Sequence, residues 1–393
     1  MNPEIVVAAD IRFPLERANG VQIVKTAAAL ARTGARTTLL VRQSDPRPTD
    51  EVLGLYGLSP HAGLEVQRLP VGHRPGAFTI PRASFLARAV LAVRAGLRRG
   101  GIVFTRDLQL ADLLLRLRQS PVVYEAHAVE SLMYGERGLL YGTAEKPEAR
   151  KAARIAARER RVWRRAHAFV TTTAGTRDTF SEAYGPRERT RVVPNGCDVP
   201  LSRSFPGLPD GARVLYAGQL YPWKGVDVLV EAVALVPQAR LVVAGGLEGE
   251  GDLARVRALV RARGIGERTE MLGTIPQGQV AAEMAKAAVV VAPFLRSAMT
   301  ERHTSPLKAF EAMAAGRPIV ASDLPSSREI LEDGRTAILV PPGEAAPLAG
   351  AVDRLLRDRP LALRLAKAAY DEAPRYSWDA RARALRELME EAL

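Results

Sequence analysis

A short run of apolar, mostly β-branched residues, then a loop and a helical segment, occurs in both halves of the chain. In the first half the run covers residues 4–10, and the helical stretch 21–33 ends before Gly34. In the second half the run covers 213–217 and the helix 226–235. Strands that alternate with helices predict parallel sheets with crossover helices on their faces. We therefore expect an α/β protein.

The 393 residues exceed what a single core usually holds. A stretch rich in Pro and Gly, 194–211, interrupts the alternation of strands and helices. We predict two Rossmann-like, doubly wound domains, 1–200 and 201–375, facing each other across a cleft, with a last helix, 376–393, packed back on the first. The predicted strands are 4–10, 36–41, 101–105, 121–125, 213–217, 240–244, 289–293, 318–322 and 337–340. Ligands of such sheets bind beyond the carboxyl ends of the strands, which places the site in the cleft.

Composition narrows the class of protein. Apolar residues make up 47% and charged residues 25%, which excludes a disordered or fibrous chain. The single cysteine, Cys197, builds neither a disulfide framework nor a thiolate metal site. Neither a signal peptide nor an apolar membrane span is apparent, so we expect a cytoplasmic protein. The net charge of +13 fits a phosphate-bearing partner or, equally, a GC-rich genome.

One helix has both of its ends marked in the sequence. Ser305 is expected as the N-cap, Pro306 at the first helical position and Gly316 just after the last turn. The helix interior is apolar or small except for Lys308 and Glu311, which predicts a largely buried helix carrying two charges.

Two interpretations of these charges are open. Lys308 and Glu311 are three residues apart and can form a structural ion pair on one helix face. Alternatively, the helix N-terminus and Lys308 bind a diphosphate, and Glu311, about 5 Å further along the axis, accepts hydrogen bonds from a ribose. The loop 218–225, after the first strand of the second half, adds Lys224 at the predicted phosphate position. A lone lysine in a loop is otherwise a solvated side chain.

Four phrases occur in a specific order and spacing. They are VPNGCD (193–198), GQLYPWKGVDVL (218–229), LVVAGG (241–246) and SPLKAFEAMAAGRPIV (305–320). On these phrases the chain resembles the retaining family-4 glycosyltransferases of the GT-B fold, also called glycosyltransferase group 1.

The resemblance implies transfer of a hexose from a nucleotide diphosphate sugar, a UDP- or GDP-sugar, to a hydroxyl of a sugar, polysaccharide or lipid-linked acceptor. It also implies retention of the anomeric configuration without a metal or other cofactor. In keeping with this, the sequence has no Asp-x-Asp pair of the kind that holds a divalent cation on a diphosphate.

The resemblance also assigns residues. It implies that Lys224 neutralises the leaving diphosphate and that Glu311 binds the ribose. It places His127, just after the strand 121–125, toward the donor sugar, where it hydrogen-bonds the sugar or shares in proton transfer; otherwise it is a satisfied core or rim histidine. The residues expected at the donor are Gly20, Gly218, Gln219, Lys224, His303, Ser305, Leu307, Lys308 and Glu311.

Two positions depart from the family pattern. The first of the family's two spaced glutamates is His303 here, with Glu301 two positions away, which leaves the donor sugar open. An arginine usual after the first loop glycine is Gln219, so Lys224 carries more of the diphosphate charge. The substitutes considered for that arginine are Arg296, Arg302 and Lys308.

Two arginine-rich helices are expected at 82–99 and 150–165 in the first domain. They present either a solvated face or a surface that docks at the inner face of an anionic membrane. The rival functions are another GT-B enzyme, such as an epimerase or a pyridoxal-phosphate phosphorylase, and a non-enzymatic polyanion-binding module. We expect no nucleic-acid partner because no such motif is present, and neither half has the Gly-x-Gly-x-x-Gly of a dehydrogenase.

Overall fold

The computed structural model of the protein describes residues 4–15, 17–72, 79–141, 147–200 and 203–392. Residues 1–3, at the chain start searched for a signal peptide, and 201–202, at the predicted domain boundary, lie outside the described residues. The chain forms two compact units. The first unit comprises residues 1–135, 147–194 and 378–393, and the second comprises 136–146 and 195–377.

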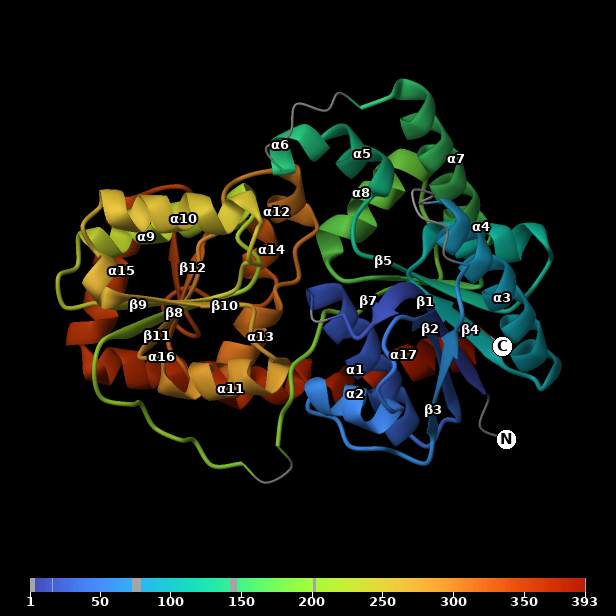
Figure 1. The fold of residues 1–393 in the computed structure, drawn as a ribbon, viewed down its shortest axis with the longest axis horizontal. Coiled ribbons are helices and arrows are strands. Elements are labelled where there is room, and N and C mark those ends of the chain that lie inside the picture. Colours follow the sequence, from blue (N-terminus) through green and yellow to red (C-terminus); the bar gives the residue numbers. More distant parts are fainter. Residues whose placement is uncertain (1–3, 16, 73–78, 142–146, 201–202, 393) are drawn as a thin grey trace. The chain divides into compact units, whose positions relative to one another are not determined.

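The first unit is built on a parallel sheet with the strand order β3-β2-β1-β4-β5-β6-β7 (Figure 1). Its strands are β1 (Ile5–Phe13), β2 (Thr37–Gln43), β3 (Leu64–Leu69), β4 (Ile102–Thr105), β5 (Val122–Ala126), β6 (Ala168–Thr171) and β7 (Thr190–Val192). Its helices are α1 (Ala18–Arg32), α2 (Thr49–Leu55), α3 (Thr79–Arg98), α4 (Leu108–Arg116), α5 (Glu130–Gly135), α7 (Ala149–Arg165), α8 (Ala174–Tyr184) and α17 (Trp378–Glu391). The strand order reverses direction between β1 and β4, which makes their carboxyl ends the topological switch point.

The second unit has a parallel sheet of order β10-β9-β8-β11-β12-β13. Its strands are β8 (Arg213–Ala217), β9 (Arg240–Ala244), β10 (Thr269–Gly273), β11 (Val289–Ala292), β12 (Ile319–Ser322) and β13 (Ile338–Val340). Its helices are α6 (Arg137–Tyr141), α9 (Val226–Ala234), α10 (Gly251–Ala262), α11 (Gln277–Lys286), α12 (Ala298–Arg302), α13 (Leu307–Ala314), α14 (Pro325–Arg328), α15 (Ala345–Arg357) and α16 (Arg359–Glu372), with 3-10 turns at Pro222–Lys224, Gly266–Arg268 and Ala373–Tyr376.

The second sheet is buried on both faces, as β8 illustrates. Val214 and Tyr216 belong to the apolar cluster on one face, and Leu215 and Ala217 belong to the cluster on the other. Side chains alternate across a strand, so a strand covered on both faces must be apolar at every position. This requirement explains why the central strands were visible in the sequence as unbroken apolar runs.

The last helix belongs to the first unit, where α17 packs against α1 (Figure 1). Arg381 of α17 is buried, and its guanidinium forms an ion pair with the buried Glu125 at the end of β5. The same side chain donates hydrogen bonds to the carbonyls of Val193 (2.7 Å) and Pro194 (2.8 Å). Because a buried charge is tolerated only when it is paired, this contact fixes the final helix on its sheet.

Each of the predicted strands is present, β8 and β9 with the predicted ends and the others with ends shifted by one to three residues, and four strands of the described residues were missed. Two of the missed strands, β3 and β10, lie at sheet edges: β3 alternates between half-buried and exposed residues, and β10 has no fully buried residue. A third, the edge strand β7, spans only three residues. The fourth, β6, spans only four residues. No helix among the described residues is long and apolar enough to cross a membrane.

Candidate functional site

The loop after β8 is held against β11 by a glycine that cannot be replaced. Gly225 has a φ of +72°, and a Cβ on it would lie 1.7 Å from the Pro293 carbonyl oxygen. The backbone N–H of Leu295 donates to the Trp223 carbonyl at 3.0 Å. Only glycine adopts this conformation at such a distance without strain. The loop therefore holds Lys224 at the carboxyl ends of β8 and β11.

The Lys224 ammonium rests on aromatic rings. Its Nζ lies 3.8 Å from the ring centroid of Trp223 and 4.9 Å from that of Phe294. No carboxylate of the described residues lies within ion-pair distance of it. Burial lowers the pKa of Lys224 to about 7, because the charged form is poorly solvated there. Ring faces supply only part of the stabilisation that an anion would give.

The helix α13 does not begin as predicted. Pro306 is the N-cap and Leu307 the first helical residue, so the expected cap at Ser305 is wrong. The Ser305 hydroxyl accepts a hydrogen bond from the Asn195 backbone N–H (3.0 Å), and the Ser305 carbonyl accepts one from Asn195 Nδ2 (2.8 Å). The side chain that was expected to cap the helix instead joins it to the start of the second unit.

Lys308 is buried in the first turn of α13 without a hydrogen-bond partner for its ammonium. Its Nζ lies 3.5 Å from the ring centroid of Tyr216 and 5.2 Å from that of Phe294. Burial, and after it the charge of Lys224, holds the pKa of Lys308 well below its usual range, while Glu311 opposes the shift. The alternative of a Lys308–Glu311 ion pair is not realised: Glu311 accepts a hydrogen bond from Gln277 instead.

Several buried polar atoms around the two lysines lack hydrogen-bond partners. They are Lys308 Nζ, the Trp223 indole N–H and Gln219 Oε1. A Cβ on Gly218, whose φ is +137°, would lie 3.5 Å from Lys308 Nζ, so the end of β8 directly adjoins that ammonium. Unpartnered buried polar groups are rare in folded proteins and call for a ligand or water. Two ammonium groups and an N–H donor suit a polyanion.

Two further residues near α13 in the sequence, His303 and Arg296, have surroundings that differ from those of Lys224 and Lys308. His303 ends α12 and is buried, and burial together with the charge of Arg302 lowers its pKa to about 4, so it is neutral at pH 7. Arg296 forms an ion pair with Glu301. Of the three cations considered as substitutes for the family's arginine, Lys308 lies near the Phe294 ring, as Lys224 does.

In the first unit, Gly20, which the family resemblance placed at the donor, lies in the first turn of α1. A Cβ on Gly20 would lie 2.0 Å from the Leu15 carbonyl oxygen. The fold itself therefore requires glycine at this position, whatever ligand approaches it.

His127 follows β5 and is largely buried. Its Nε2 lies 3.1 Å from Glu125 Oε1, within ion-pair distance, although this nitrogen makes no hydrogen bond. Burial, and then the charge of Arg106, lowers the pKa of His127 to about 4. Glu125 is held by Arg381 and by Gln22 Nε2 at 3.1 and 3.2 Å. At neutral pH the imidazole is neutral and suited to hydrogen bonding.

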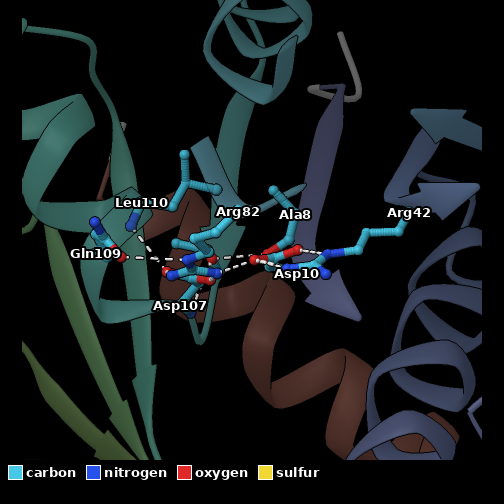
Figure 2. A network of polar contacts seen from close by, with 8 residues as sticks. Ala8, Asp10, Arg42, Arg82, Asp107, Gln109 and Leu110 are labelled. Carbon is cyan, nitrogen blue, oxygen red and sulfur yellow. Dashed lines mark hydrogen bonds and ion pairs between the residues drawn. The ribbon is translucent and has the colours of Figure 1, made fainter. Parts of the chain in front are cut away.

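Sequence reasoning missed a pocket in the first unit at the carboxyl ends of β1 and β4. It has a volume of about 760 Å³ and is lined by residues of β1, α1, α3, α4, α5 and α7, among them Asp10, Arg82, Arg106 and Asp107. Figure 2 shows its ion-pair network, in which Arg82 bridges Asp10 and Asp107 while Arg42 binds Asp10 from the other side. Only the arginine-rich pattern of α7 hinted at this site. Elsewhere, no group of three or more His, Cys, Asp or Glu side chains in the described part of the chain is placed to hold a metal ion.

Known structures define the fold class. Sucrose-phosphate synthase from Thermosynechococcus elongatus superposes with a TM-score of 0.76 over 99% of this chain and 98% of that one, at 23% sequence identity. Anabaena HepE in complex with UDP and glucose superposes with a TM-score of 0.75 over 99% and 100% of the two chains, at 18% identity. The two parallel α/β sheets thus form a GT-B fold, as predicted.

The sequence defines the family. The model described as "Glycosyl transferase 4-like domain" matches residues 19–196, and the model described as "Glycosyl transferases group 1" matches 211–358. The D-inositol 3-phosphate glycosyltransferase of Stackebrandtia nassauensis is 28% identical over 91% of this chain and 83% of its own length. The chain belongs to the family-4, or group 1, glycosyltransferases, and it is an enzyme of the hexosyltransferase class.

Proposed function

We propose that this enzyme transfers a hexose from a UDP- or GDP-sugar to a hydroxyl acceptor, with retention of the anomeric configuration and without a metal ion. The observation that carries the donor assignment is the pair Lys224 and Lys308. Both ammonium groups lie on aromatic rings near Phe294, and neither has a carboxylate partner among the described residues. Two like charges held together in an apolar surrounding are stabilised by a bound polyanion.

The two lysines take the role of stabilising the leaving group. In the reaction the acceptor oxygen forms a bond to the anomeric carbon, the bond from that carbon to the diphosphate breaks, and the acceptor proton is released. The nucleoside diphosphate leaves with added negative charge, which positioned cations stabilise. Glu311 lies one turn deeper in α13 and binds the ribose hydroxyls. Gly218, Gln219, His303, Ser305 and Leu307 complete the proposed donor site.

His127 is proposed to hydrogen-bond the donor sugar. Its pKa of about 4 argues against a role as the proton acceptor, because a group so weakly basic takes up few protons at pH 7. Its Nε2 makes no hydrogen bond within the protein, which leaves this nitrogen for the sugar. Gly20 is proposed to lie near the ligand as well, although the Leu15 carbonyl already accounts for its lack of a side chain.

The names of similar proteins support a phosphate-rich donor and an alcohol acceptor. HepE was crystallised with UDP and glucose, and the Stackebrandtia relative is named for D-inositol 3-phosphate. A sugar, polysaccharide or lipid-linked alcohol therefore remains the proposed acceptor class.

The test is a binding and product assay. Calorimetric titration with UDP, GDP and ADP on wild type should give one preferred nucleotide. Glu311→Ala should weaken it about tenfold, the effect of losing one charged hydrogen bond. Wild type should bind the 2′-deoxy nucleotide more weakly than the parent nucleotide. Glu311→Ala should bind the two nucleotides with equal affinity. Absence of nucleotide binding, or an undiminished ribose preference in the variant, contradicts the assignment.

The stereochemistry and the metal independence are tested on the product. With the donor selected by titration, proton NMR of the glycoside formed in excess EDTA should show the anomeric configuration of the donor. An inverted product, or activity that EDTA abolishes and a divalent cation restores, contradicts the proposal.

We further propose that the enzyme works in the cytoplasm with peripheral contact at the membrane through α3. Arg94, Arg98 and Arg118 line a shallow basic hollow in which no carboxylate of the described residues pairs with them. Leu91 on the same helix is 64% exposed. Cations beside an exposed leucine suit an anionic bilayer surface. Co-sedimentation with anionic but not zwitterionic vesicles, lost in Arg94→Glu/Arg98→Glu, is expected; equal recovery with both vesicle types contradicts the contact.

A further inference from the structure

The pocket of the first unit lies where an open parallel sheet normally binds its ligand. Its walls come from the carboxyl ends of β1 and β4, where the strand order reverses, and from α7. Its residues divide into two groups with different charge balance.

The first group is electrically balanced. Asp10 accepts hydrogen bonds from Arg42 and Arg82, and Asp107 accepts from Arg82 Nη2 at 2.7 Å while capping α4 through the Leu110 N–H at 2.9 Å (Figure 2). Two guanidinium groups thus face two carboxylates. The lone pairs that these oxygens retain are suited to accept hydrogen bonds from hydroxyl groups of a ligand.

The second group carries an excess of positive charge. Lys151, Arg154 and Arg158 lie at spacings of three and four residues and so share one face of α7, and all three line the pocket. Neither Lys151 nor Arg154 forms an ion pair with a described residue, and Arg158 is 3.9 Å from Asp112, which Arg161 already binds at 2.7 Å.

Arg106 adds a fourth cation from the loop before α4. Its Nη1 donates to the Gln22 side-chain oxygen at 3.1 Å, and no carboxylate of the described chain is within ion-pair distance. Burial lowers the pKa of Arg106, yet a guanidinium keeps its proton in proteins, so its charge remains. The pocket carboxyl outside the ion-pair network is Glu130, whose pKa desolvation and the nearby Glu159 raise to about 7.

We propose that this pocket binds the acceptor as a phosphorylated polyol, with the phosphate on Arg106, Lys151, Arg154 and Arg158 and the hydroxyls directed to Asp10 and Asp107. The guanidinium groups offer paired donors that match phosphate oxygens. This inference rests on the proposed glycosyl transfer and specifies its acceptor. The phosphate belongs either to a free phosphosugar or phosphocyclitol or to the headgroup of a lipid, which share this chemistry.

The experiment measures acceptor binding to the full chain by calorimetry. The probes are myo-inositol 1-phosphate and glucose 6-phosphate, their unphosphorylated parents, and phosphatidylcholine vesicles with and without phosphatidylinositol. Wild type should bind a phosphorylated probe, soluble or in vesicles, at least about tenfold more tightly than the parent alcohol. Lys151→Ala/Arg154→Ala, both exposed positions, should remove most of this preference.

The matched control is Arg160→Ala/Arg164→Ala, which removes two exposed charges from another face of α7, away from the pocket lining. It should retain the wild-type preference. An equal loss in the control, or no preference for phosphorylated probes in wild type, overturns the inference. A preference confined to soluble probes identifies a free phosphate ester, and one confined to vesicles that Lys151→Ala/Arg154→Ala abolishes identifies a lipid headgroup.

UDP or GDP titration separates this inference from the proposed function. Both double variants should bind the nucleotide as wild type does, because the proposed donor site lies in the second unit. If the nucleotide binds and phosphorylated polyols do not, only the acceptor inference fails. If no nucleotide binds to wild type, the proposed function fails, whatever the pocket binds.

Discussion

The ion-pair network of the first unit and the lysine pair of the second unit both lie at the carboxyl ends of strands, but their charges are balanced differently. In the first unit Arg82 and Arg42 are paired with Asp10 and Asp107. In the second unit Lys224 and Lys308 rest on aromatic rings. A paired cation supports the fold, whereas an unpaired, buried one costs stability and is retained for what it binds. The contrast separates residues that build a site from residues that contact the ligand.

Removing both lysines should have the largest effect. Lys224→Ala/Lys308→Ala is expected to weaken binding of the preferred nucleoside diphosphate on the order of 1000-fold, because each charged hydrogen bond contributes roughly 2 kcal/mol. Calorimetric titration measures it. Lys286→Ala, which removes an exposed lysine paired with Glu283, is the control and should bind normally. Near-normal affinity in the double variant would mean that the diphosphate binds elsewhere.

Removing a paired cation should act on the fold instead. Arg82→Met leaves Asp107 without a cation and weakens the neutralisation of Asp10, so the free energy of unfolding should fall by about 3 kcal/mol. Urea denaturation of the first unit's transition measures this loss. Nucleotide affinity should be unchanged. The control is Arg88→Met, which removes an exposed arginine and should leave both stability and nucleotide affinity at their wild-type values. A variant with wild-type stability and lost nucleotide binding would reverse the contrast.

Removing an unpaired cation should make the ligand-free protein more stable. Lys308→Met is expected to raise the free energy of unfolding by about 1–2 kcal/mol, because an apolar side chain replaces a buried ammonium that has no hydrogen-bond partner. Thermal and urea unfolding without nucleotide measure this gain, with Lys286→Met as the comparison. A loss of stability would indicate that the ring contacts outweigh the cost of burial.

The pH dependence of nucleotide binding should be the smallest effect. Because the pKa of Lys224 is about 7 without ligand, the side chain loses its proton as the pH rises through 7, and binding a diphosphate above that pH must take up a proton. Affinity should fall between pH 7.5 and 9 by up to about tenfold per pH unit. Titrations in buffers of different ionisation enthalpy count the protons.

The matched variant for this pH effect is Lys224→Arg, because an arginine keeps its charge throughout the range. Lys224→Arg should reduce the fall of nucleotide affinity with rising pH, so that only the part due to the titration of Lys308 remains. A wild-type affinity that is independent of pH, with no proton uptake, would show that Lys224 stays charged without ligand.

The sequence was most informative where burial leaves few choices. Central strands such as β8 and β11 are apolar on both faces and were found to within a residue, whereas the half-exposed edge strand β3 has no such pattern. Lys308 stood out because a charge inside an apolar helix needs an explanation. Gly225, at the end of the loop 218–225, has a φ of +72°, a backbone conformation that glycine adopts without strain.

Other parts of the site depend on residues far apart in the chain. The Ser305 hydroxyl is taken by Asn195, 110 positions earlier, so local capping rules failed there. The pocket joins Asp10, Arg106 and Arg154, which come from three separate elements. Phe294, which lies near both lysines, looks in the sequence like an ordinary apolar residue after a strand. Such combinations are set by topology, and no window of sequence contains them.

The position of Arg381 bears on how the protein is made. Its ion pair with Glu125 belongs to the first unit, but about two hundred residues of the second unit are translated between the two partners. During synthesis the buried Glu125 therefore lacks this cation until Arg381 in α17 has been translated. The second unit is complete earlier, so vectorial folding from the ribosome should favour it, against the usual order in which the N-terminal domain folds first.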